Sequence, residues 1–233
     1  MEYSGSKEGK ERIHYGNFEA NKKFLNKVGL PQKGDRVLEI GCGNGGMLHY
    51  LRTEGYEAEG VEISQEHIEK ANRIYGNLPI KKVDGVELPY ESNTFDVVMS
   101  FDVLEHIPNT DGHLKEVGRV LKVERSYLLQ SPNKWTNTIF ETIRCRSFTK
   151  WREDHCSLHS YYQFIQRFRK NRFSVKFYNI PVVNDYFKRK IYRYLGYAGI
   201  AALKLINPDM LPIPLKTNFY MKAKNENSCI YDG

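Results

Sequence analysis

A glycine-rich segment near residue 40 carries the most recognisable chemistry in this 233-residue chain. Gly41, Gly43 and Gly46 follow the spacing G-x-G-x-x-G, and Glu62 lies 21 residues after the first glycine. Glycines let the backbone turn sharply after a strand and approach a ligand closely, and the helix that follows directs free N–H groups at the ligand. A carboxylate at the end of the next strand accepts hydrogen bonds from ribose hydroxyls. The pattern predicts a site for an adenosine-containing cofactor without deciding which one.

Three further features distinguish between such cofactors. Glu39 stands two positions before Gly41, where a dinucleotide-binding strand usually keeps an apolar residue. Asp84 follows the third expected strand, with Leu88 and Pro89 close behind it. The fourth expected strand and the residues after it read Phe95-Asp96-Val97-Val98 and Ser100-Phe101-Asp102-Val103-Leu104-Glu105-His106. An NAD-dependent dehydrogenase would leave Glu39 and the Asp84 segment unexplained.

Together and in this order, these motifs resemble the class I S-adenosylmethionine-dependent methyltransferases, especially their ubiquinone-biosynthesis-like and generic small-molecule branches. The resemblance covers residues 30–133 and extends more loosely to about 180. One departure is the turn expected before the fifth strand, where the family usually has a Pro-Gly-Gly-like sequence and this chain has Lys122-Val123-Glu124-Arg125. That turn lies away from the donor site, so the departure concerns its geometry and not the cofactor.

The resemblance implies S-adenosyl-L-methionine as the cofactor and S-adenosyl-L-homocysteine as its product. Glu39 would contact the amino-acid portion of the donor, and Phe101 would line the floor of the site under the methyl-bearing sulfonium. The rest of that contact would come from the glycine loop, namely Gly41, Cys42, Gly43, Asn44 and Gly45.

Other matching positions imply contacts to the adenosine portion of the donor. Glu62 would hold both ribose hydroxyls, and Ile63 would pack on the adenine. Asp84 would accept a hydrogen bond from the adenine amino group, and Gly85 would offer a backbone N–H. Tyr15 would either close over the donor or pack as a surface aromatic residue.

Catalysis depends on the acceptor. Methyl transfer is an in-line displacement in which the protein mainly aligns the two reactants. An oxygen acceptor also needs a base, and the candidates are His106, His155 and His159. His106 follows the fourth strand at the carboxyl edge, where ligands bind in such sheets, unless it only makes a structural hydrogen bond before Pro108. His155 and His159 flank an expected helix cap at Ser157, and each either touches the acceptor or is a surface histidine.

Some chemistries are not supported. Cys145, His155, Cys156 and His159 match no strong spacing of zinc ligands, so no metal site is predicted. Methylation of nucleobase amines typically uses an Asn-Pro-Pro-Tyr-like box after the fourth strand, and the sequence there is Ser100-Phe101-Asp102-Val103. A Pro-Cys nucleophile is absent as well, so nucleic acid is not expected as a partner.

The elements that position these residues alternate between strand-like and helix-like segments. Strands are expected at 35–40, 58–63, 80–83, 95–101, 126–130, 173–178 and 218–224. Helices are expected at 47–53, 65–75, 113–122, 160–169 and 185–206, with an irregular segment at 134–154. The pattern predicts an α/β fold: a doubly wound, Rossmann-like, mostly parallel seven-stranded sheet with an antiparallel last strand, plus an inserted and C-terminal helical lid region.

A single domain is expected, divided into an N-terminal helical cap, a donor-binding core, substrate-covering elements with the last helices, and a final strand, at 1–30, 31–133, 134–215 and 216–224. The segment after the fifth strand occupies the place where this family inserts a substrate-covering element. Asn133, Trp135 and Trp151 are candidate walls of the substrate pocket, or they are structural parts of a lid.

Charge is distributed unevenly along the chain. Residues 1–133 contain 17 Lys and Arg against 21 Asp and Glu, whereas residues 134–233 contain 18 against 7, which together give the net charge of +7. The basic second half is either a solvated surface or a face for an anionic partner. Residues 186–206 combine a basic start with an apolar stretch, which suits a peripheral helix on anionic lipid or a lid over a lipidic substrate. Packing against the core or a second subunit is the alternative.

The chain has four scattered cysteines, Cys42, Cys145, Cys156 and Cys229. The first thirty residues contain no apolar run of the kind found in a signal peptide. No stretch reaches the roughly 18 apolar residues that a membrane-spanning helix needs. A cytoplasmic protein is therefore expected. The first functional hypothesis is methylation of a small molecule at oxygen, with a quinone-like, lipid-linked or sugar-derived acceptor. The alternatives are an RNA or protein methyltransferase and a non-catalytic, donor-binding regulatory subunit. The acceptor, the base and the oligomeric state stay open.

Overall fold

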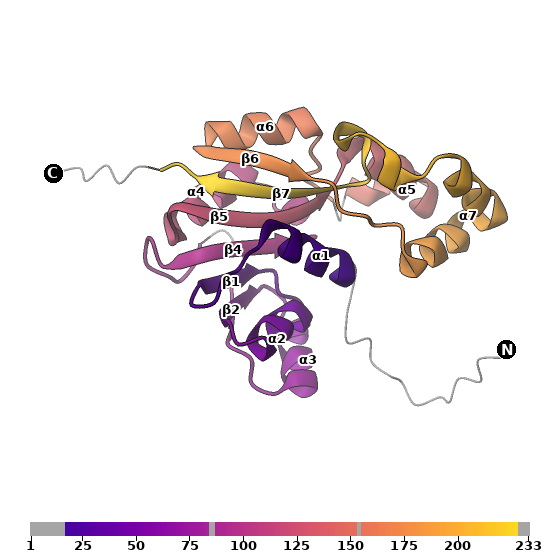
Figure 1. Cartoon of the computed structure of the whole chain (residues 1–233). Coiled ribbons are helices and arrows are strands. Elements are labelled where there is room, and N and C mark those ends of the chain that lie inside the picture. The colour runs from indigo at the N-terminus through magenta and orange to yellow at the C-terminus, as the bar shows by residue number, and fades with distance from the viewer. Residues whose placement is uncertain (1–16, 84–86, 153–154, 228–233) are drawn as a thin grey trace.

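The computed structural model describes residues 17–83, 87–152 and 155–227 (Figure 1). The strands are β1 (Arg36–Ile40), β2 (Glu57–Glu62), β3 (Ile80–Lys82), β4 (Phe95–Phe101), β5 (Leu121–Pro132), β6 (Phe173–Tyr178) and β7 (Asn218–Asn225). The α-helices are α1 (Phe18–Val28), α2 (Gly46–Thr53), α3 (Gln65–Tyr75), α4 (Thr110–Val120), α5 (Lys134–Cys145), α6 (Tyr161–Lys170) and α7 (Asp185–Leu205). Short 3-10 helices are η1 (Leu104–His106), η2 (Lys150–Arg152), η3 (Pro208–Met210) and η4 (Ile213–Leu215).

The seven strands form one sheet in the order β3-β2-β1-β4-β5-β7-β6. Strand β7 runs antiparallel to both of its neighbours, β5 and β6, and the other pairs are parallel. The chain order reverses direction at β1, from which one half of the sheet continues to β2 and the other to β4. This confirms the predicted doubly wound, mostly parallel sheet with an antiparallel last strand.

The two faces of the sheet bury separate apolar cores because successive side chains along a strand point to opposite faces. In β5, Tyr127 and Leu129 belong to one core and Leu128 to the other. Helices α4 and α6 cover the first face, and α1 and α2 cover the second. The central strands therefore read as nearly continuous apolar runs, which is typical of a sheet covered on both sides.

Helix α5 corrects one expectation, since residues 134–154 were expected to be irregular. Its sequence has several Thr and aromatic residues with low helix propensity, which hid the helix from a reading of propensity alone. The Asn133 side chain caps it by accepting a hydrogen bond from the Trp135 backbone N–H at 3.2 Å. Tertiary contacts supply the rest, including the ring of Phe140, which lies edge-on to Tyr194 of α7 at 5.8 Å.

Two boundaries also differ from expectation. Helix α6 is capped by Ser160, which forms a reciprocal capping box with Gln163, so the expected cap at Ser157 is wrong. The Ser157 N–H instead donates to the Glu105 carbonyl at 2.9 Å. These contacts fix the chain just before α6 against η1.

The expected turn at residues 122–125 lies inside β5, which starts at Leu121, directly after α4. The register between β4 and β5 shifts at this point, and Glu124 has a left-handed φ of 64°. Lys122 and Arg125 both contact the Asp96 carboxylate, at 2.9 and 3.0 Å. A bulge stabilised by ion pairs thus stands where the family's glycine-rich turn was expected.

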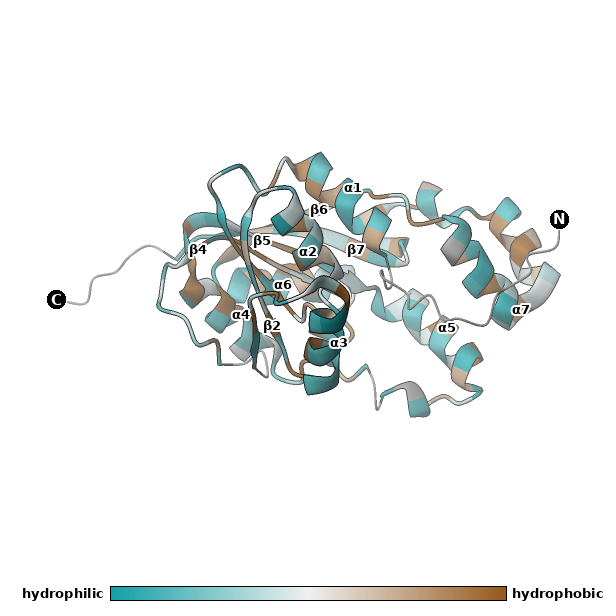
Figure 2. Ribbon diagram, turned by 90° about the horizontal axis from the view of Figure 1, so that it is seen from below, coloured by the Kyte–Doolittle hydropathy of each residue, from teal (hydrophilic) through white to brown (hydrophobic). Residues whose placement is uncertain are grey.

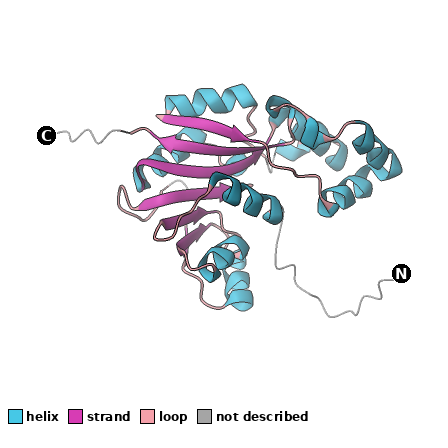
Figure 3. Ribbon diagram, viewed as in Figure 1, coloured by secondary structure: helices cyan, strands magenta, loops and turns pink. Residues whose placement is uncertain are grey.

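The parallel strands present their carboxyl ends at one edge, and α5 and α7 extend beyond that edge (Figure 3). Within the described part of the chain, no helix has the length and apolar character needed to cross a membrane. The loop after β1, η1, α5 and α7 border the edge of the sheet where β1, β4 and β5 end.

Candidate functional site

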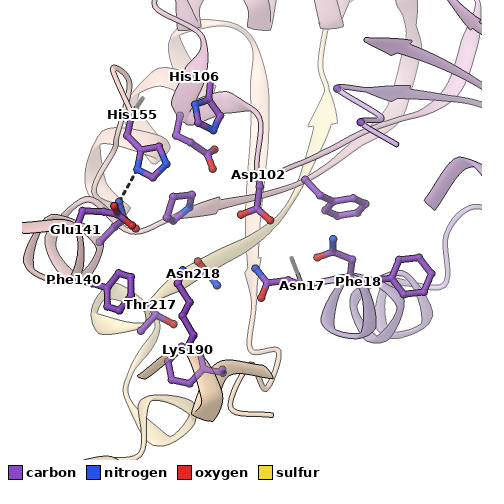
Figure 4. Close-up of a pocket in the computed structure, with 18 of the residues that line it drawn as sticks. Asn17, Phe18, Asp102, His106, Phe140, Glu141, His155, Lys190, Thr217 and Asn218 are labelled. Carbon is purple, nitrogen blue, oxygen red and sulfur yellow. Dashed lines mark hydrogen bonds between the residues drawn. The ribbon is translucent and has the colours of Figure 1, made fainter. Parts of the chain in front are cut away.

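A cavity of about 910 Å³ lies at the carboxyl edge of the sheet. Its walls come from the start of α1, the loop after β1, η1, α5 and α7 (Figure 4). Ligand cavities in proteins usually measure roughly 300–1,000 Å³. This volume is enough for a cofactor and a second molecule side by side.

The loop between β1 and α2 forms one end of the cavity through residues 41–44. Gly41 has φ 67°, and a Cβ there would lie 2.5 Å from Cγ2 of Val103, so only glycine fits. A Cβ on Gly43, at φ 53°, would meet no atom within 4 Å, so the loop presents bare backbone to the cavity. The Val61 carbonyl accepts hydrogen bonds from the N–H groups of Gly41 at 2.8 Å and of its successor at 3.1 Å. The loop is thereby fixed to β2.

Glu39 lies at the end of β1 and lines the cavity, although only 5% of its surface is exposed. Burial and the charge of Glu62 raise its pKa to about 8, and the Leu48 backbone N–H partly offsets this. Its Oε2 is buried without a hydrogen-bond partner among the described residues. A buried carboxyl with one unsatisfied oxygen is suited to bind a cationic amine.

Glu62 has a structural task that the sequence did not indicate. Its carboxylate accepts hydrogen bonds from the N–H groups of Gly43 at 2.8 Å and Ser64 at 2.9 Å. It therefore joins the end of β2 to the glycine loop, and it does not line the cavity. The implied contact of Glu62 with ribose hydroxyls stays a prediction.

The remaining positions implied for donor binding divide into three groups. Phe101 lines the cavity with the loop residues. Gly45 is the N-cap of α2 and does not line the cavity, and Ile63 is 63% exposed outside it. The positions outside the described residues are Tyr15, Asp84 and Gly85.

Two carboxyl groups that line the cavity, those of Asp102 and Glu105, belong to the motif after the fourth strand, but the sequence predicted no role for them. Asp102 follows β4 with a left-handed φ of 55°, and its N–H donates to Oε1 of Gln130 at 3.0 Å. Desolvation raises the Asp102 pKa, and Gln130, Lys190 and His106 oppose the shift. Glu105 is 2% exposed and accepts a hydrogen bond from Ser131. Their position at the carboxyl end of the fourth strand was the signal that could have identified them.

Burial and the charge of Asp102 raise the pKa of Glu105 to about 8. At neutral pH Glu105 is therefore largely protonated, and the cavity carries less negative charge than its carboxyl groups would suggest.

The structure brings two of the three candidate bases together. His106 in η1 and His155 before α6 both line the cavity, with ring centroids 5.0 Å apart (Figure 4). The Asn137 side chain lies 3.0 Å from Nδ1 of His155 through its amide nitrogen. Since that nitrogen donates, Nδ1 accepts, and a neutral His155 carries its proton on Nε2.

His159 lies elsewhere, packed against Phe164 at a ring-centroid distance of 5.1 Å and 5% exposed. Burial, reinforced by Arg167, lowers the His159 pKa to about 4, so the ring is neutral at physiological pH. It does not line the cavity.

The predicted pocket walls are not brought to the cavity either. Asn133 is fully buried and donates from Nδ2 to the carbonyls of Pro214 at 3.0 Å and Lys216 at 2.8 Å. Trp135 is 62% exposed and does not line the cavity. The side chain of Trp151 lies outside the described part of the structure.

Comparison with known proteins assigns the chain to a family. Residues 13–176 match the model of a methyltransferase domain. The chain is 29% identical over 124 residues to a sterol 4-C-methyltransferase of Caenorhabditis elegans, covering 51% of this chain and 34% of that protein. It is 32% identical over 130 residues to the 27-O-demethylrifamycin SV methyltransferase of Amycolatopsis mediterranei, covering 48% of each. The chain thus spans about half or less of these relatives' lengths.

A solved structure extends the likeness of the fold. The phosphoethanolamine N-methyltransferase 2 of Haemonchus contortus, in complex with phosphomonomethylethanolamine and S-adenosylhomocysteine, superposes with a TM-score of 0.64 at 20% identity. The alignment covers 91% of this chain and 53% of that protein. With the glycine loop, the sheet order and the family match in agreement, this chain belongs to the class I S-adenosylmethionine-dependent methyltransferases.

Proposed function

We propose that this protein transfers a methyl group from S-adenosylmethionine to an oxygen atom of a small molecule. The observation that carries the proposal is one cavity that reaches from the Glu39 carboxyl and the glycine loop to the paired rings of His106 and His155. Donor and acceptor would meet between these two ends.

The donor end fits the amino-acid portion of S-adenosylmethionine. The unpartnered Oε2 of Glu39 would accept from its ammonium group, and the bare backbone at Gly43 would allow its carboxylate to approach. When bound, this cofactor supplies an electrophilic methyl group on a sulfonium. Phe101 would line the floor of the site. The roles of Glu62 and Ile63, like those of Tyr15, Asp84 and Gly85 outside the described residues, belong to the same proposal.

The acceptor end supports an oxygen nucleophile because it holds a base. His106 would take the proton of an acceptor hydroxyl as the methyl group is transferred. The Asn137 contact leaves the proton of neutral His155 on Nε2, so His155 would orient the acceptor or His106 as a hydrogen-bond donor. Relatives whose names specify methylation at oxygen and at carbon are both similar to this chain, so the base is the more specific argument.

A small acceptor suits the cavity better than a macromolecule. The acceptor end lies between η1, α5 and α7, which border a compact cavity of a size that suits a small molecule. Quinone-like, lipid-linked and sugar-derived hydroxyl compounds are the classes to screen. A cytoplasmic location stays a prediction.

The test is a methyl-transfer assay with S-adenosylmethionine and a panel of these hydroxyl compounds, with methylated product detected by mass spectrometry. For an accepted compound, His106→Ala is expected to lower kcat roughly 100-fold or more while leaving binding of S-adenosylhomocysteine intact. The control is His49→Ala, because the ring of His49 stacks on Tyr75 at 4.3 Å and does not line the cavity. Equal activity of the His106 variant and wild type would refute the role of the base.

A further inference from the structure

Helix α7 is a long element with very little buried surface. Although the helix has 21 residues, no side chain described in it is buried, and the one buried position is Gly199. Helices in water normally depend on packing of one face for their stability. Helix α7 contacts α5 at two points: Tyr194 meets the ring of Phe140, and the Lys190 ammonium lies 4.7 Å from the centre of the same ring.

A kink divides α7 into two halves of different character. Gly196 has φ 58° and ψ −150°, outside helical geometry. The half before the kink contains one acidic residue, Asp185, and four basic residues: Lys188, Arg189, Lys190 and Arg193. After it, residues 197–206 contain one charged side chain, Lys204, in an otherwise apolar or aromatic stretch.

Exposed apolar side chains gather around this helix. Of the large hydrophobic residues exposed in the described chain, all except Ile63 lie in the range from Trp135 to Leu215, and within that range Tyr162 belongs to α6. The most exposed are Leu205 at 86%, Phe148 at 82%, and Tyr197 and Met210 at 81% each. Figure 2 shows brown segments on α5 and α7 where these helices extend beyond the sheet. Concentrations of exposed apolar residues usually mark a binding surface.

Charge complementarity selects the occupant of this surface. Its exposed cations, which include Lys188, Arg189 and Arg193, suit an anionic partner. A second copy of this chain would bring two basic surfaces together, and nucleic acid would leave aliphatic side chains such as Leu205 and Ile206 without a partner. Basic and aromatic residues next to an exposed aliphatic helix match an anionic bilayer surface, where the charges meet headgroups and the apolar side chains enter the acyl boundary.

We infer that α7 docks this protein on anionic lipid membranes, with the basic half at the headgroups and the half after Gly196 inserted at the interface. Helix α7 also lines the cavity, mainly through its first half with Phe187, Lys190, Ile191 and Tyr194, and after the kink through Leu203. Docking would therefore bring the acceptor end of the cavity to the membrane surface, where a lipid-linked acceptor could enter directly. The docking itself does not depend on the proposed function.

The test is co-sedimentation of the full chain with phosphatidylcholine vesicles, with and without phosphatidylserine. Binding is expected only to the vesicles that contain phosphatidylserine, and it should weaken as salt increases. Lys188→Gln with Arg189→Gln should weaken it roughly 30-fold, and Leu205→Gln with Ile206→Gln roughly 10-fold or more. All four side chains are exposed, and none lines the cavity.

Matched controls lie on other helices. Lys115→Gln with Arg169→Gln removes two exposed cations from α4 and α6, and Tyr162→Gln removes an exposed aromatic residue from α6. These variants should bind the vesicles as wild type does, and thermal unfolding and binding of S-adenosylhomocysteine should be the same in all variants. Equal binding to both kinds of vesicle, binding to neither, or loss that does not depend on which helix is changed would overturn the inference. So would self-association through α7 that leaves it unavailable to lipid.

Discussion

Glu39 has an ionisation state that depends on what the cavity contains. With a pKa of about 8 its carboxyl group is mostly protonated at pH 7, whereas a bound ammonium would favour the ionised form. Binding of S-adenosylhomocysteine at pH 7 should therefore release up to one proton. Isothermal titration in buffers of different ionisation enthalpy should reveal this release, and affinity should increase from pH 6 to 8.

Glu39→Gln should lower the affinity for S-adenosylhomocysteine roughly 10- to 100-fold, because a charge-assisted hydrogen bond is replaced by a neutral one, and it should abolish the buffer dependence. Glu69→Gln is the control, since Glu69 is an exposed residue of α3 that does not line the cavity. A buffer-independent enthalpy in wild type would show that Glu39 does not meet the ligand's amine.

The histidines show how much of the site could be predicted at the residue scale. Spacing treated His155 and His159 alike, yet His155 lines the cavity and His159 is packed under α6. Four residues of separation place two side chains on one face only inside a helix, and α6 begins after both of them. Similarly, the G-x-G-x-x-G pattern predicted the loop, but no local pattern could reveal that Glu62 binds its backbone from the next strand.

At the scale of elements, Asn133 connects three segments. Its Oδ1 caps α5, and its Nδ2 donates to two carbonyls of the segment that precedes β7. Asn133→Ala should therefore reduce the free energy of unfolding by about 2–4 kcal/mol, because it removes a cap and leaves two carbonyls without that donor. Chemical denaturation should show the loss, with little change in S-adenosylhomocysteine affinity.

Asn184→Ala is the matched control, since Asn184 caps the exposed helix α7 by accepting from the Phe187 N–H at 2.9 Å. Asn184→Ala should reduce the free energy of unfolding by about 1 kcal/mol. If the Asn133→Ala variant is as stable as wild type but has altered kinetics for the acceptor, Asn133 would instead be part of the substrate pocket, as the sequence predicted.

Elements were predictable where periodicity and buried runs set them. The strands of the sheet followed from apolar runs such as 95–101, which corresponds to β4. Helix α5 was not predictable in this way, because its low-propensity sequence is held by the Asn133 cap and by contacts with a helix about fifty residues later. Such support comes from tertiary structure and leaves no signal in a local window.

For the whole molecule, buried carboxyl groups make stability depend on pH. Glu39 and Glu105 have folded-state pKa values raised to about 8 from 4.5, so the folded protein holds protons that the unfolded chain has lost. Their contribution is fully present below the unfolded pKa and is lost as pH rises through 8. Below pH 6.5, the titration of His159 makes stability increase with pH, because burial lowers the pKa of His159 to about 4 in the folded protein. The free energy of unfolding should therefore decrease most steeply between pH 6.5 and 8.

Urea denaturation at a series of pH values measures this slope, to which each group contributes at most about 1.4 kcal/mol per pH unit. Glu39→Gln should reduce the slope and Glu69→Gln should leave it unchanged. Stability that rises across this range in wild type would contradict the assigned ionisation of the cavity.

The central claim is that this cavity binds the methyl donor, and isothermal titration of the wild-type chain with S-adenosylmethionine, S-adenosylhomocysteine and NAD tests it most directly. We predict saturable one-to-one binding of the first two and none of NAD, with Glu62→Ala combined with Asp84→Ala abolishing the binding. Binding of NAD instead, or of none of the three, would contradict the account, and the glycine loop would then serve another nucleotide or none.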